Sequence, residues 1–177
     1  MMNFDKNGRV IFTIPVVTGM IYCWIQTVIT GALLFDTFVL YPNIFSDVPK
    51  SLSTSMAFLS HASPGSFFPP LGASSLVIGL AALWFWRGQR QVFYYFLTCF
   101  LLVVAFDFIA SALYFWPRNA IMFTEGMKVH DAQTLITAAG EFRSLHWVRV
   151  AGSIAASFCA MTGLVAAVQH VIRNCQD

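Results

Sequence analysis

The chain has 177 residues, of which 58% are hydrophobic and only 10% are charged, with a formal net charge of +2 at pH 7. Soluble domains average about 25% charged residues, so this composition excludes an ordinary soluble domain and indicates that lipid solvates much of the surface. The small and scattered positive charge also argues against a nucleic-acid-binding protein.

The first predicted transmembrane segment covers about residues 10–39. Its charge-free run, Val10–Phe35, is longer than the roughly 7–15 apolar residues of a signal-peptide core, and no small-residue cleavage site follows it. We therefore expect this segment to be a retained transmembrane helix. Asp36 lies near its far end, and the proline at position 42, Pro42, predicts a stop at the membrane interface.

Residues 40–70 are predicted to form a polar loop on the side of the membrane opposite the chain termini, which we call the far side. The pair Pro69–Pro70 is expected at the start of the second helix, because proline is tolerated in a first turn and disrupts a helix interior. The second and third spans are predicted at about residues 71–86 and 91–116.

The segment 117–148 is the only long stretch that mixes charged and apolar residues. We expect Pro117 to close the third span and this segment to be a far-side interfacial loop with one short amphipathic helix, at about 131–139. The fourth span is predicted at about 149–172, with a face of small residues that suits close helix packing.

Four spans predict an all-α, multi-pass membrane protein: an antiparallel four-transmembrane-helix bundle that forms a single domain over residues 1–177. The even number of spans places both termini on one side. The predicted topology puts five basic residues on each side, so the positive-inside rule alone does not orient the protein. The short, acid-free turn Arg87–Arg90 favours cytoplasmic termini.

Helix direction brings several ionisable residues to the far end of the predicted bundle. Asp36 ends the first span, and Asp107 lies about 16 residues into the third, or roughly 24 Å along it. His146 and Arg149 open the fourth span and share a helix face with Phe142. Because ionisable residues within a membrane usually face the interior of the helix bundle and often mark function, these side chains predict a site.

Two alternatives stand beside a functional site. Asp107 and Arg149 could form a purely structural ion pair. A metal site would draw on His61, His130 and His146 with nearby carboxylates. No recognised metal-ligand spacing is present, so we expect neither a metal nor another cofactor. The four cysteines also lack such spacing and are expected to be small buried apolar residues.

Some of these residues also form a pattern. Pro42 stands at the exit of the first span, Asn119 follows the third, and His146 and Arg149 form a His-x-x-Arg frame at the opening of the fourth. This pattern resembles that of the anthrone oxygenase-like family of small membrane proteins, with His146 in place of a usual asparagine. Some members of that family convert polyketide anthrones to anthraquinones without an evident metal or flavin.

The resemblance implies a membrane oxidoreductase, a cofactor-independent monooxygenase or a related enzyme, that acts on a hydrophobic aromatic or lipid-like molecule. Arg149 would stabilise a developing phenolate or enolate, and His146 or Asp107 would move the proton. The residues expected to contact the substrate are Asp36, Arg118, Asn119, Phe142 and Trp147.

A second class of function stays open from the sequence. The small-residue helix faces and the aromatic surface suit a non-catalytic small subunit equally well, either an assembly component or a lipid-binding component of a larger membrane complex. An oligomer of this chain is a further alternative. The partners expected in either case are the lipid bilayer and a hydrophobic small molecule.

Overall fold

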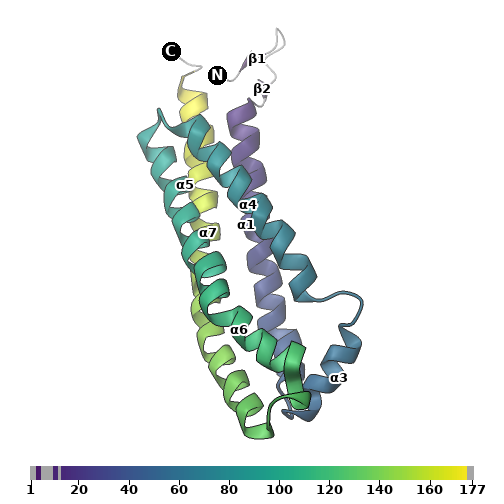
Figure 1. Ribbon diagram of the computed structural model, residues 1–177. Helices are drawn as coiled ribbons and strands as arrows, with labels where there is room; N and C mark the ends of the chain where they lie inside the picture. The colour runs from purple at the N-terminus through teal and green to yellow at the C-terminus, as the bar shows by residue number, and fades with distance from the viewer. Residues whose placement is uncertain (1–2, 5–9, 12, 175–177) are drawn as a thin grey trace.

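The computed structural model describes residues 3–4, 10–11 and 13–174, and these are almost wholly helical. Four helices within this part are long and apolar enough to cross a membrane: Ile14–Ile44, Pro64–Trp86, Arg90–Lys128 and Ala132–Arg173. The prediction of an all-α chain with four candidate membrane spans is therefore confirmed. Figure 1 shows these helices side by side, with the start of the first and the end of the last at the same end of the molecule.

The first long helix changes its winding where it approaches the far end. It comprises α1 (Ile14–Phe35), a π-helical segment (Asp36–Leu40) and α2 (Tyr41–Ile44). Pro42 lacks the N–H that an α-helix would use and its ring crowds the preceding turn, so the wider π turn just before it keeps the helix continuous. A two-residue antiparallel ladder, β1 (Asn3–Phe4) with β2 (Val10–Ile11), precedes this helix.

The expected far-side loop 40–70 is largely helical, and the expected start of the second span is wrong. A short helix, α3 (Lys50–Phe58), occupies the middle of that stretch, and α4 (Pro64–Trp86) begins well before residue 71. Pro69 and Pro70 lie inside α4. The backbone N–H groups that these two prolines lack would lie within the first two turns of the helix. Pro64 and the capping box at Ser63 already start the helix there.

The third helix does not end at Pro117, contrary to the sequence prediction. It comprises α5 (Arg90–Leu102), π-helical segments Val103–Ile109 and Ser111–Phe115, α6 (Trp116–Asn119), a further π-helical segment Ala120–Glu125 and a final 3₁₀ turn, Gly126–Lys128. The π turn directly before Pro117 absorbs its missing hydrogen bond, as the one before Pro42 does. The helix ends near Gly126, which adopts a φ of +55°.

The interfacial loop expected at 117–148 is also wrong, because α7 runs unbroken over Ala132–Arg173. Asp131 caps this helix by accepting a 2.9 Å hydrogen bond from the Thr134 backbone N–H, and hydrogen bonds from Thr134 lower the pKa of Asp131. A 42-residue helix is about 63 Å long, roughly twice the thickness of the hydrocarbon core. The apolar layer of a membrane is too thin to cover the whole of α7, so charged residues near the far end of this helix do not require a loop.

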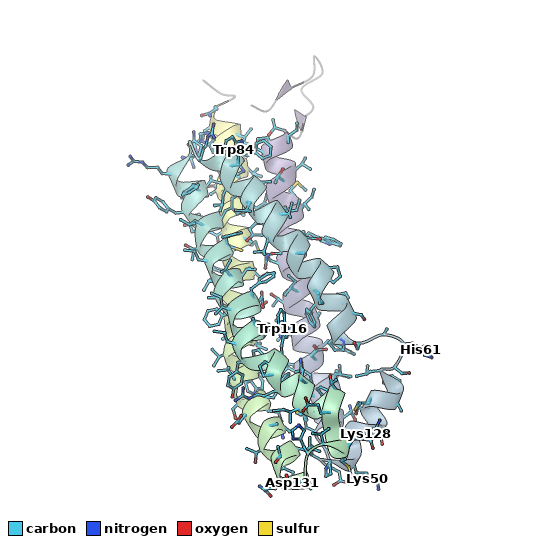
Figure 2. The ribbon with its side chains drawn as sticks, in the orientation of Figure 1. Lys50, His61, Trp84, Trp116, Lys128 and Asp131 are labelled. Carbon is cyan, nitrogen blue, oxygen red and sulfur yellow. The ribbon has the colours of Figure 1, made fainter. Side chains whose placement is uncertain are left out.

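An apolar core holds these far ends together. Met122 and Leu135 are fully buried, and Phe115 and Phe142 pack in the same cluster with Leu52 of α3. Figure 1 shows α3 beside this far end, and Figure 2 shows Lys50, Lys128 and Asp131 there and Trp84 near the opposite end. Burial of these large apolar side chains stabilises helix where the charge pattern alone suggested loop.

Each of the four elements α1, α4, α5 and α7 packs on two neighbours: α7 packs on α1 and α5, and α4 packs on α1 and α5. The third long helix and α7 pack very closely at Gly152, next to the polar residues Asp107 and Arg149. A Cβ atom added at Gly152 of α7 would lie 2.4 Å from Cγ of Phe106, so only glycine allows this ring to sit against the helix. Asp107 follows Phe106 directly, and this contact sets its distance from α7.

Candidate functional site

The structure brings together the two ionisable residues that helix direction predicts to meet. Arg149 of α7 donates from Nε to Oδ1 of Asp107, across a distance of 3.5 Å. Both side chains are largely buried, with 13% of Arg149 and 9% of Asp107 exposed. The distance is at the long end for a hydrogen bond, so the pair is loose. The other carboxylate oxygen, Oδ2 of Asp107, has no hydrogen-bond partner among the described residues.

Asp107 and Arg149 border a cavity of about 230 Å³, which we call the inner cavity. Six aromatic side chains, two uncharged polar side chains and two glycines share its wall: Tyr41, Gly65, Phe68, Gly72, Phe108, Ser111, Phe115, Trp116, Asn119 and Phe142. The Arg149 guanidinium carbon lies 5.4 Å from the ring centre of Phe68 and 5.3 Å from that of Phe115, within cation–π range. Such a cavity suits a flat apolar molecule with one polar edge directed at the charged pair.

His146 lies behind this wall and does not border the cavity. Its ring stacks on Phe142, with ring centres 6.1 Å apart and an interplanar angle of 7°, and meets Tyr41 edge-on at 4.7 Å. His146 is 2% exposed. It therefore supports two rings of the cavity wall from behind, whereas Asp107 and Arg149 border the cavity directly.

The protonation pattern of His146 follows from its partner, Thr37. The Thr37 hydroxyl lies 2.8 Å from Nε2 of His146 and donates to the carbonyl oxygen of Leu33 at 2.6 Å. Because that hydroxyl has only one proton, Nε2 of a neutral His146 must be the donor to Thr37. Nδ1 is then an unprotonated acceptor, and it has no hydrogen-bond partner among the described residues.

The other predicted site residues separate into two groups. Asn119 and Phe142 border the inner cavity. Trp147 is 54% exposed and meets Phe38 on the outer surface, since it lies one residue round the helix from His146. Arg118 forms an ion pair with Glu141, at 2.5 Å from Nη2 to Oε2, and neither it nor Trp147 borders the cavity. Asp36 borders a separate groove, described below.

Sequence reasoning missed several residues that shape the site. Tyr41 was not among the predicted site residues, yet its ring borders the cavity and contacts His146. Ser111 lies four residues after Asp107 and therefore on the same helix face, a spacing that could have identified it. Polar residues at spacings of four also mark the inner face of the first helix, where buried Gln26 donates to Ser75 at 2.5 Å.

The histidines considered for a metal site lie apart. His130 pairs with Glu125 at the far-end turn, His61 is exposed on the α3–α4 connection, and His146 is buried behind the cavity. Figure 2 shows His61 well away from Asp131. Among the described residues there is no group of three or more His, Cys, Asp or Glu side chains placed to hold a metal ion.

No protein-family model, curated protein or solved structure matches this chain in sequence or fold comparisons. The interpretation of the inner cavity therefore rests on its own residues and on the sequence pattern described above.

Proposed function

We propose that the protein is a membrane oxidoreductase that binds a flat, acidic aromatic molecule in the inner cavity and oxidises it with molecular oxygen, without a cofactor of its own. It crosses the membrane as an antiparallel bundle of four helices, with both termini in the cytoplasm. The cavity then lies near the far membrane interface, where α4 begins at Pro64. A hydrophobic substrate reaches this level from the lipid.

The observation that carries the proposal is the incomplete pairing of Asp107 and Arg149 inside an aromatic cavity. A structural ion pair would have short contacts and satisfied oxygens, because unpaired charged atoms in an apolar setting are unfavourable. Here the single contact is 3.5 Å long, Oδ2 of Asp107 is unpartnered among the described residues, and both residues border open volume. The carboxylate can accept a proton and the guanidinium can bind an oxyanion.

The chemistry needs only these two groups and oxygen. The Asp107 carboxylate takes a proton from an activated CH₂ group, while Arg149 binds the enolate or phenolate oxygen that becomes negative. The carbanion gives electrons to O₂, a C–O bond forms, and Asp107 returns its proton to give a hydroperoxide. Loss of water breaks the O–O bond and leaves a carbonyl, so CH₂ and O₂ become C=O and H₂O.

The experiment uses anthrone as the substrate, purified protein in detergent, and oxygen uptake with anthraquinone formation as the readouts. The wild-type rate should exceed the spontaneous oxidation measured in detergent alone. Compared at equal amounts of folded protein, Asp107→Asn and Arg149→Gln should each lower the protein-dependent rate by about 100-fold or more. Arg143→Gln is the matched control, because Arg143 is an exposed arginine on the same helix and does not border the cavity.

Three results would overturn the proposal. The first is a wild-type rate no faster than detergent alone, and the second is an equal loss in Arg143→Gln. The third is binding of anthrone at Arg149 without oxygen uptake, which would identify the protein instead as a non-catalytic component that binds hydrophobic molecules.

A further inference from the structure

A second and larger hollow lies outside the helix bundle at the far end. It has a volume of about 1120 Å³ and is bordered by the far part of the first long helix, by α3 and by the start of α4. We call it the outer groove. Figure 1 shows α3 beside the bundle, joined to α4 by a connection that arches outwards. The outer groove and the inner cavity share Pro64 and Phe68 at the start of α4, which separates them.

Asp36 is a buried acidic residue of this groove whose side chain is not fully hydrogen-bonded by the described residues. It borders the groove from the first helix, is only 4% exposed, and its Oδ2 has no hydrogen-bond partner among the described residues. Arg149, the cation of the neighbouring inner cavity, donates to Asp107 instead. A buried carboxylate without a donor is strongly unfavourable, so Asp36 calls for a donor from outside the chain.

The other residues of the groove wall indicate which kind of molecule would provide that hydrogen-bond donor. Apolar side chains from all three walls border it, among them Phe35, Val39, Phe58 and Phe67, and each of these is exposed. The other charged residues of the wall are Asp47 and Lys50, so the wall has two carboxylates and one ammonium group. An apolar groove with a net negative wall is complementary to a cationic amphiphile.

We propose that the outer groove binds a long-chain amine from the adjacent lipid leaflet, with its ammonium group on Asp36 and its chain against the apolar walls. This site is separate from the inner cavity and takes a ligand of opposite charge. An ammonium group supplies the hydrogen-bond donor that Oδ2 of Asp36 lacks among the described residues, its charge complements the net negative wall, and the aromatic walls cover the chain.

The test compares hexadecylamine with hexadecanol at pH 7, where the amine is protonated. Apparent dissociation constants come from native mass spectrometry of the protein released from detergent micelles. Wild type should bind the amine at least about 10-fold more tightly than the alcohol. Asp36→Asn, which keeps the shape and removes the charge, should reduce this preference to about one. Asp47→Asn is the matched control and should keep most of it, because Asp47 is exposed and screened by water.

A second pair of variants tests the location. Ser55 borders the groove from α3, whereas Ser53 is an exposed residue of α3 that does not border it. Ser55→Trp should fill the groove and weaken binding of both probes, and Ser53→Trp should leave both unchanged. Equal affinity of wild type for the two probes, an amine preference that persists in Asp36→Asn, or undiminished binding in Ser55→Trp would each overturn the proposal. Anthrone oxidation is not part of this test, so the two proposals fail separately.

Discussion

Removing one charge of the Asp107–Arg149 pair should destabilise the protein far more than removing both. At 3.5 Å the gross attraction between the two charges is about 5 kcal/mol for an effective dielectric constant of about 20. Desolvation of both groups opposes this attraction, so the net value of the pair is small. Asp107→Asn or Arg149→Gln alone leaves an uncompensated buried charge, and each should lower the free energy of unfolding by about 3 kcal/mol.

The double variant should lie within about 1 kcal/mol of wild type, which corresponds to a coupling energy of several kcal/mol between the two positions. Reversible unfolding in mixed detergent micelles, followed by tryptophan fluorescence, measures all four proteins under one condition. Arg143→Gln is the control for loss of an exposed arginine and should change stability by less than about 0.5 kcal/mol. If the losses of unfolding free energy in the two single variants simply added in the double variant, the prediction would be refuted, because the two side chains would then not interact.

Gly152→Ala should destabilise the protein by about 1–3 kcal/mol because its Cβ would overlap the ring of Phe106, whereas Gly31→Ala, with no atom within 4 Å of its Cβ, should be neutral or slightly stabilising in the same unfolding assay. Single cysteines at Ser51 and Gly88, in a background without native cysteines, should react with an impermeant thiol reagent from opposite sides of the membrane; reaction of both from one side would contradict the proposed topology. Elemental analysis of the pure protein should find less than one equivalent of tightly bound copper, zinc or iron per chain, and a full equivalent lost on substitution of a histidine would make a metal enzyme the better account.

The fold class could be predicted because it depends on composition and on the length of apolar runs. The helix ends could not, because they depend on contacts between distant segments. Pro117 ends a helix by the usual rule, yet a π turn before it and the packing of Phe115 and Met122 into the far-end core keep the helix intact. Leu135 and Phe142 likewise draw the mixed segment into α7. Charge pattern alone does not reveal this burial.

Some residues of the candidate site could likewise be placed from the sequence, and others could not. Helix direction and depth were enough to bring Asp107 and Arg149 together. The placement of Tyr41 was not predictable, because the π-helical turn at Asp36–Leu40 changes the rotation of every later residue of the first helix by about 100° relative to an α-helix. Tyr41 thereby borders the inner cavity, while Asp36 borders the outer groove.

The most direct test of the account is the affinity of the inner cavity for a flat phenol before and after Arg149→Lys. Binding of 1,8-dihydroxyanthraquinone to protein in lipid nanodiscs can be followed by quenching of tryptophan fluorescence. Lysine keeps the positive charge and loses the planar guanidinium that lies within cation–π range of Phe68 and Phe115, so affinity should fall by about 10-fold or more while thermal stability is retained. Equal affinity in wild type and Arg149→Lys, at equal stability, would contradict the claim that Arg149 binds the ligand.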